Sequence, residues 1–155
     1  MQRFGIAPKF SGIAAVYGIP AGWLTYRHPD VFVIRSIPYW GLAGFAAGLL
    51  VAGTAVYVKS LRAFNVAYRE GRLVTEGPFA VVRHPIYAAW ILLIIPGVAL
   101  FFRSWLLLPV PLVAYVAFKV FIHEEDDCLR RRFGQSYLEY RFGVGELFPR
   151  FHGKQ

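Results

Sequence analysis

Four long apolar stretches constrain the fold of this chain more than any other feature of its sequence. Each stretch is about 17–20 residues long, and a helix of that length crosses the roughly 30 Å hydrocarbon core of a bilayer. Only 17% of the 155 residues are charged, which is below the roughly one quarter typical of a soluble domain. The four stretches occupy residues 10–26, 39–58, 86–102 and 105–122.

The sequence therefore predicts an all-α fold, a polytopic membrane helix bundle with about four transmembrane helices and a cytoplasmic amphipathic helix at the C-terminal end. The length fits a single domain over residues 1–155. Its expected parts are a two-helix hairpin (1–58), a loop (59–85), two further helices (86–122) and a cytoplasmic tail (123–155).

Three local features refine this prediction. No A-x-A-like cleavage site follows the first stretch, so we expect a retained anchor and not a signal peptide. Only Arg103 and Ser104 separate the third and fourth stretches, which predicts a tight hairpin. Gly44 and Gly48 form a small-xxx-small pair that favours close helix packing and permits a homodimer.

The basic residues divide unequally between the two sides of the predicted bundle. With four crossings, 14 of the 17 Lys and Arg residues share one side with both termini, among them Arg3 and Lys154. Basic residues gather on the cytoplasmic side of membrane proteins, so a multi-pass integral membrane protein with both termini in the cytoplasm is expected. The net charge of +8 then reports orientation, and nucleic acid is not an expected partner.

The loop ends in a run of residues suited to ligand binding, Arg83-His84-Pro85. Pro85 suits the first turn of a helix, where its missing N–H costs nothing. Arg83 and His84 are therefore expected at a helix N-terminus, whose free N–H groups and dipole favour an anion. The alternative is that Arg83 only reaches lipid phosphates and His84 only caps the helix.

The tail begins with a run of acids in which Glu125 differs from its neighbours. Glu125, Leu129, Phe133 and Tyr137 recur at a spacing of four, which places them on one face of a helix. Glu125 heads this otherwise apolar face directly under the membrane, so its carboxylate needs a cationic or hydrogen-bonding partner.

The other acids of the run are typical of a solvated helix. Asp126 with Arg130, and Asp127 with Arg131, have the i,i+4 spacing of helical ion pairs. No metal site is expected, because the histidines and acids lack a metal-ligand spacing and the chain has a single cysteine, Cys128.

Several motifs follow one another in series between about residues 60 and 150. They are Leu73-Val74-Thr75-x-Gly77-Pro78-Phe79, Arg83-His84-Pro85-x-Tyr87, Glu124-Glu125 and Phe133-Gly134-x-x-Tyr137-x-x-Tyr140. In order and spacing, this series resembles the isoprenylcysteine carboxyl methyltransferase and phospholipid methyltransferase superfamily. The resemblance implies an integral membrane enzyme that takes a methyl group from S-adenosyl-L-methionine. It also implies a cofactor pocket built from the cytoplasmic loop, the last membrane helices and the C-terminal segment.

The resemblance further implies roles for individual residues. We expect the catalytic residues to be Arg83, His84 and Glu125, of which Arg83 and His84 anchor the cofactor and Glu125 binds its polar end. Phe79 stands where the family usually has a tyrosine that touches the cofactor. The residues implied to bind the cofactor are Gly71, Arg72, Leu73, Val74, Phe79, His84, Pro85, Ile86, Tyr87, Glu125, Tyr137 and Tyr140.

The methyl acceptor is left open by the sequence. In the carboxyl methyltransferases an arginine four residues before the glutamate faces the substrate carboxylate, and here Phe121 takes that place. The expected acceptor is a lipid or small hydrophobic molecule with an oxygen, nitrogen or sulfur nucleophile. The alternatives are a small four-helix transporter and a non-catalytic membrane scaffold. None of the nine acids falls in a predicted crossing, which counts against a proton-exchanging transporter.

Overall fold

The structure, a computed structural model, describes residues 6–150, so Arg3 and Lys154 lie outside the described residues. Within that range the regular elements are helices, joined by two isolated β-bridges. This confirms the all-α prediction for the described chain. The helices are α1 (Ala7–Arg27), α2 (Pro29–Phe32), α3 (Tyr39–Glu70), η1 (Gly77–Ala80), α4 (Pro85–Ala88), η2 (Ala89–Ile94), α5 (Ile95–Phe101), α6 (Val110–Phe133) and α7 (Gln135–Gly143).

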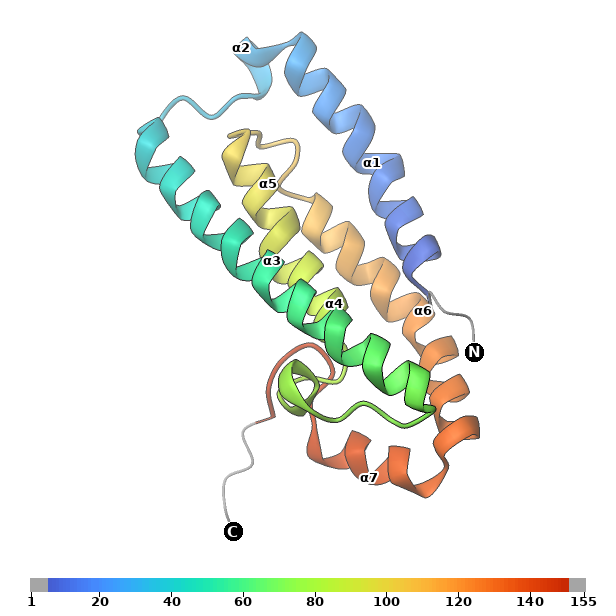
Figure 1. Cartoon of the computed structure of the whole chain (residues 1–155). Helices are drawn as coiled ribbons and strands as arrows, with labels where there is room; N and C mark the ends of the chain where they lie inside the picture. The colour runs from blue at the N-terminus through green and yellow to red at the C-terminus, as the bar shows by residue number, and fades with distance from the viewer. Residues whose placement is uncertain (1–5, 151–155) are drawn as a thin grey trace.

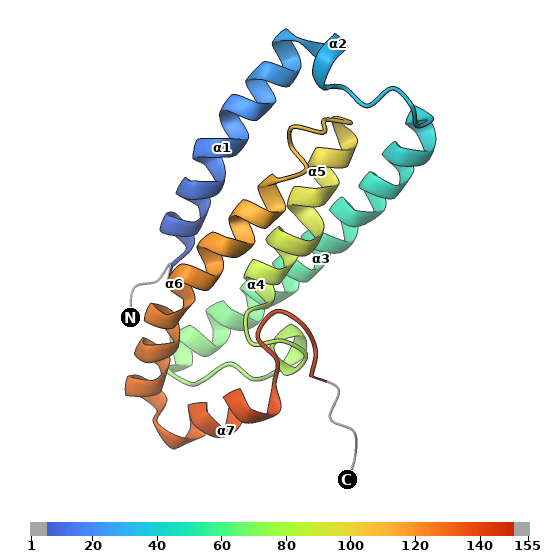
Figure 2. The same ribbon diagram turned by 180° about the vertical axis from the view of Figure 1, so that it is seen from behind.

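The long helices lie side by side along the molecule, with α7 and the η1 loop at one end and α2 at the other (Figures 1 and 2). Helix α1 continues through Pro20 without a break. Helix α3 runs well past its apolar stretch, so residues 59–70 are helical where the sequence predicted loop. The reason is that Ser60 and Ala67 extend the buried face of α3. Gly71 then ends the helix at φ +68°, a conformation that glycine adopts without strain.

The third apolar stretch is one continuous helical rod built from α4, η2 and α5. Its middle part, η2, is a π-helix that ends just before Pro96, a residue with no N–H to donate. The rod packs closely on α3 at Gly53, where an added Cβ would lie 2.7 Å from Ile94 Cγ1. Gly44 and Gly48, the predicted packing pair, face open space within this chain.

The third and fourth stretches do pack against each other as a hairpin, but the predicted tight connection at Arg103 and Ser104 is wrong. Residues 102–109 form a connection of successive turns, and α6 begins only at Val110. Pro109 and Pro111 explain the late start, because proline suits the N-terminus of a helix and not its interior. The connection is fixed to the segment after α2, since Val33 bridges to Ser104 and Ile34 N–H donates to Arg103 O (2.7 Å).

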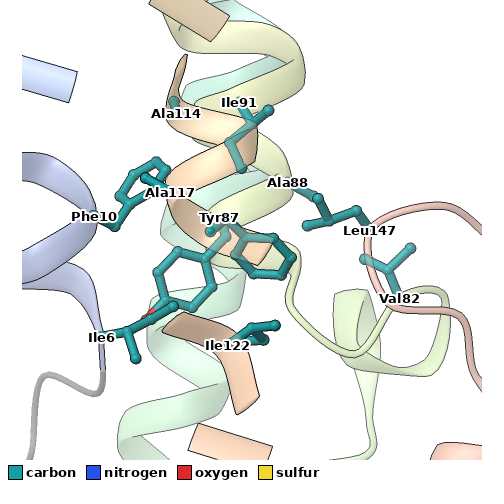
Figure 3. Packing of buried hydrophobic residues seen from close by; sticks show 11 residues of the cluster. Ile6, Phe10, Val82, Tyr87, Ala88, Ile91, Ala114, Ala117, Ile122 and Leu147 are labelled. Carbon is teal, nitrogen blue, oxygen red and sulfur yellow. The ribbon is translucent and has the colours of Figure 1, made fainter. Parts of the chain in front are cut away.

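A buried apolar cluster lies between α1, α4, η2 and α6, beside the α7 end of the molecule (Figure 3). Tyr87 and Ile91 point into it from the third stretch, and Phe10 packs its ring edge-on against Tyr87 at 5.7 Å between centroids. Leu147, from the chain after α7, packs against the same cluster. The core therefore holds the start of α4, and with it the Arg83-His84-Pro85 run, in a fixed place.

Among the described helices, α3 alone is long and apolar enough to cross a membrane. Its most apolar 18-residue segment has a mean hydropathy of 1.8. The outward faces of the other long helices are apolar too: Val16 on α1 is 77% exposed and Leu112 on α6 is 65% exposed. Apolar surface on this scale is suited to lipid and not to water. Four crossings and cytoplasmic termini stay predictions from the sequence.

Candidate functional site

A cavity of about 790 Å³ opens at the α7 end of the bundle, within the size range of small-molecule sites. Its walls come from α3, the loop after it, the start of α4, the second half of α6, and α7. Most of the residues predicted from the sequence line this cavity together: Arg72, Leu73, Val74, Phe79, Arg83, His84, Ile86, Tyr87, Glu125, Tyr137 and Tyr140.

Two predicted residues do not line the cavity. Gly71 ends α3 through its left-handed backbone, and Pro85 is buried at the first turn of α4. Gly71 and Pro85 determine where α3 ends and α4 begins, so they influence the shape of the cavity wall without lining it.

His84 is the centre of the site because a carboxylate lies on each side of its ring. Its Nε2 lies 3.3 Å from Asp126 Oδ1, and its Nδ1 lies 3.7 Å from Glu125 Oε1. The side chain is only 4% exposed. Burial lowers the pKa of His84, but the hydrogen bonds and charges of Asp126 and Glu125 outweigh burial, so the pKa is raised above its usual 6.5. The arrangement favours a charged imidazolium in the cavity wall.

Glu125 has the partners that its position on an apolar face demanded. The Tyr87 hydroxyl donates to Glu125 Oε2 at 2.9 Å, and the Ile6 N–H donates to the same oxygen at 3.3 Å. Burial raises the pKa of Glu125, but His84, Tyr87 and Ile6 together outweigh it and lower the pKa below its usual 4.5. Glu125 is therefore an anion that keeps acceptor capacity for a ligand, since a carboxylate accepts about four hydrogen bonds.

The predicted single helical face from Glu125 to Tyr137 is wrong in its last member. Leu129 and Phe133 do line the cavity from α6, but α6 ends at Phe133, and Gly134 turns the chain at φ +54°. Tyr137 reaches the site from α7, which folds back under the cavity.

Asp126 is the main residue that the sequence reasoning misplaced. It is 4% exposed and is not part of a solvated pair with Arg130. Its Oδ2 accepts from Arg83 Nη1 at 3.2 Å, and Tyr137 donates to its Oδ1. Burial raises the pKa of Asp126, but its bonds to His84, Tyr137 and Arg83 outweigh burial and hold the pKa well below 3.8.

A sequence signal for Asp126 was present. Ala114, Phe118, Ile122 and Asp126 follow one another at a spacing of four, and all four are buried. Asp126 therefore continues the core-facing stripe of α6. The second predicted pair, between Asp127 and Arg131, does not form an ion pair in the described part of the chain either.

The backbone N–H groups of Arg83 and His84 are not free for an anion. They donate to Gly145 O at 2.7 Å and Glu146 O at 3.1 Å. Arg83 is also buried, at 9% exposure, and is paired with Asp126, so it does not reach lipid phosphates. The lipid-phosphate alternative for Arg83 is therefore wrong, whereas an anion site at the N-terminus of α4, beside Arg83 and His84 in the cavity wall, stays a prediction.

The segment after α7 forms a strap, residues 144–148, that holds the Arg83-His84 run. Val82 pairs with Gly145 in a parallel bridge, and Lys119 on α6 forms a 2.6 Å ion pair with Glu146. Helix α7 adds a second tie, because the Tyr140 hydroxyl donates to Phe79 O at 2.6 Å. Burial raises the pKa of Tyr140, so its hydroxyl stays a neutral donor. The sequence reasoning missed this strap.

An apolar groove of about 730 Å³ adjoins the cavity between α1 and the α4–η2–α5 rod. Among residues 6–150, no Asp, Glu, Lys, Arg or His lines it. Four residues belong to the walls of both the cavity and the groove: Ala7, Tyr57, Ile86 and Tyr87. The two spaces therefore meet at these residues, and charged side chains line part of the cavity, whereas the groove is lined by apolar side chains and a few hydroxyl groups.

The sequence of the chain is similar to that of known methyltransferases. The model of the isoprenylcysteine carboxyl methyltransferase (ICMT) family matches residues 49–131. The chain is also 35% identical over 134 residues to a Protein-S-isoprenylcysteine O-methyltransferase of Tribolium castaneum, an alignment covering 83% of this chain and 47% of that relative. The chain thus spans about half the length of the curated relative that it matches. On both findings, the chain belongs to the isoprenylcysteine carboxyl methyltransferase family.

Proposed function

We propose that this chain is a membrane methyltransferase that uses S-adenosyl-L-methionine as its methyl donor. The observation that carries the proposal is the meeting of a polar cavity with an apolar groove at Tyr57, Ile86 and Tyr87. A polar donor from the cytoplasm and a hydrophobic acceptor from the bilayer need two such spaces that share a wall. The family match supports this activity.

The cavity residues fit the chemical groups of the donor. Glu125 is an anion with spare acceptor capacity, suited to an ammonium or to ribose hydroxyls. Phe64, Tyr68 and Phe133 offer rings that suit an adenine. For a carboxylate, the cavity wall offers the guanidinium of Arg72, which is also paired with Glu70 and Glu76, and the ring of His84, whose nitrogens also face Glu125 and Asp126. When bound, the cofactor supplies an electrophilic sulfonium methyl.

The protein's own part in the reaction is to position two partners and to exclude water. Tyr57 and Tyr87 stand in the wall that the cavity shares with the groove, and α7 adds Tyr137 and Tyr140 to the wall of the cavity. No residue need act as a base for an acceptor that is already an anion. A neutral amine acceptor has a proton to lose after it is methylated.

The acceptor that we propose is a molecule with a long hydrocarbon tail, because the described side chains that line the groove are uncharged. The relative's name points to an S-isoprenylcysteine carboxylate. Phe121, in place of the family's arginine, leaves room for an oxygen, nitrogen or sulfur nucleophile on another lipid.

The test is binding followed by transfer, on the full chain purified in detergent. Titration calorimetry with S-adenosylhomocysteine should show saturable binding. A transporter or a scaffold has no need to bind this molecule. Protein in vesicles is then incubated with methyl-labelled cofactor and either native membrane lipid or an S-farnesylcysteine. Label in one fraction identifies the acceptor class. Absence of both binding and transfer would refute the enzyme and favour the alternatives.

A further inference from the structure

One buried carboxylate joins three separate segments of the chain. Asp126 lies on α6, and its oxygens bond Arg83 and His84 from the loop before α4 and Tyr137 from α7. Arg141 of α7 also lies 3.7 Å from Asp126 Oδ2. Asp126 itself is absent from the walls of the cavity, whereas its partners Arg83, His84 and Tyr137 all line it.

We propose that Asp126 is the positioning residue of this cavity, whose carboxylate holds Arg83, His84 and Tyr137 where they face the cofactor. The part that concerns the cofactor rests on the proposed function. The part that concerns the three side chains rests on their contacts alone.

Arg83 depends on Asp126 for its place. Its side chain is 8% exposed and its Nε has no hydrogen-bond partner. Its polar side-chain contacts run through Nη1, to Asp126 at 3.2 Å and to the Tyr137 hydroxyl at 3.5 Å. A buried guanidinium needs an opposite charge, and Asp126 supplies it. Without that charge, Arg83 would be free to bind an anion in the cavity.

His84 depends on Asp126 for its charge. The groups that face its ring are Asp126 and Glu125 from α6, the Tyr87 ring from α4 at 6.1 Å, and the Phe118 ring from α6 at 5.7 Å. Arg83 is its neighbour in the loop. Two of these groups are anions that raise the pKa of His84. Removal of one anion therefore lowers that pKa, while Glu125 still holds Nδ1.

The experiment titrates His84 directly, before any cofactor is added. The full chain is labelled with ¹⁵N-histidine in detergent, and the His84 signal is assigned by its loss in His84→Gln. In Asp126→Asn we expect the midpoint of the His84 titration to fall by about one pH unit or more, the usual effect of one nearby opposite charge. Glu139→Gln, an exposed acid on α7 outside the cavity wall, is the matched control and should leave the midpoint unchanged.

Binding of S-adenosylhomocysteine is then measured across the same pH range. A positioning role predicts that the pH midpoint of binding in Asp126→Asn moves down together with that of His84. A His84 midpoint that stays in place would overturn the inference, as would a binding profile that keeps its midpoint while only thermal stability falls. Absence of binding by the unaltered chain would instead refute the proposed function. The His84 titration would still test whether Asp126 sets the charge of His84.

A second variant covers the case in which Asp126→Asn does not fold. Tyr137→Phe removes a hydrogen bond to Asp126 but keeps its charge. The Asp126 carboxylate is then freer to pair with His84, so the His84 midpoint should stay or rise. A fall in Tyr137→Phe would contradict the inference, because it would show that Asp126 is not what sets the charge of His84.

Discussion

At the residue scale, Glu125 is the acid on which we expect cofactor affinity to depend most. Replacing it in Glu125→Gln removes the charge and keeps the shape, which costs a charge-assisted hydrogen bond of about 1.5–3 kcal/mol. Titration calorimetry with S-adenosylhomocysteine should show a dissociation constant raised about tenfold or more. Glu139→Gln should bind as the unaltered chain does. Equal binding by both variants would remove Glu125 from the site.

The same cluster predicts how stability varies with pH. The pKa of His84 is raised above 6.5, so its contribution is fully present below pH 6.5 and is lost as pH rises through the raised value. The pKa of Asp126 is lowered below 3.8, so its contribution is present above pH 3.8 and is lost as pH falls through the lowered value. The melting temperature of the protein in detergent should therefore be highest between about pH 4 and 6.5.

His84→Gln isolates the alkaline side of that profile. The variant should lose the decline in melting temperature that begins above pH 6.5 and keep the decline on the acid side. An unchanged alkaline decline in His84→Gln would show that another group causes it.

Single residues also show where sequence reasoning ends. Eleven of the residues predicted to bind the cofactor or to be catalytic line one cavity, because the motif series fixes which segments meet. Asp126 was misplaced because its acidic neighbours Glu124 and Asp127 are exposed and made the whole run look solvated. Its true partners, Arg83 and Tyr137, are 43 and 11 residues away, and no local spacing reveals such contacts.

At the element scale, the strap after α7 is what holds the start of α4. Gly145 has no room for a side chain, since an added Cβ would lie 1.9 Å from Phe148 O. Gly145→Ala should therefore displace the strap and break the bonds from the Arg83 and His84 N–H groups. We expect weaker S-adenosylhomocysteine binding, by about tenfold or more for loss of two such bonds.

The matched control for the strap is two residues away. An added Cβ at Gly143 meets nothing within 4 Å, so Gly143→Ala should bind and unfold as the unaltered chain does. Equal affinities for Gly143→Ala and Gly145→Ala would show that the strap does not position the site.

The helices themselves were predicted better than their ends. Apolar stretches located all four long rods, because burial and lipid exposure depend on composition that can be read locally. The ends of α3 and α6 were misjudged for opposite reasons. Helix α3 continues past Val58 because polar as well as apolar side chains, such as Ser60, are buried along its inner face. Helix α6 starts late because Pro109 and Pro111 favour a helix N-terminus at this point.

At the scale of the whole molecule, the arrangement of the helices across the bilayer can be tested with new cysteines. Cys128→Ser gives a cysteine-free background. Ser36→Cys lies between α2 and α3, Ser136→Cys lies on α7 at the other end, and both positions are exposed. With four crossings, an impermeant maleimide applied to intact cells should label Ser36→Cys alone. Ser136→Cys should react only after permeabilisation, and labelling of both in intact cells would contradict the topology.

The shared wall at Tyr57, Ile86 and Tyr87 sets how the protein would experience its two substrates. The relevant concentration of a donor that arrives through the polar cavity is its amount per volume of water. The relevant concentration of an acceptor that arrives through the apolar groove is its amount per area of membrane. Turnover would then follow the mole fraction of acceptor among the lipids, and diluting the bilayer with inert lipid would slow the reaction even though the total amount of acceptor in the sample stays the same.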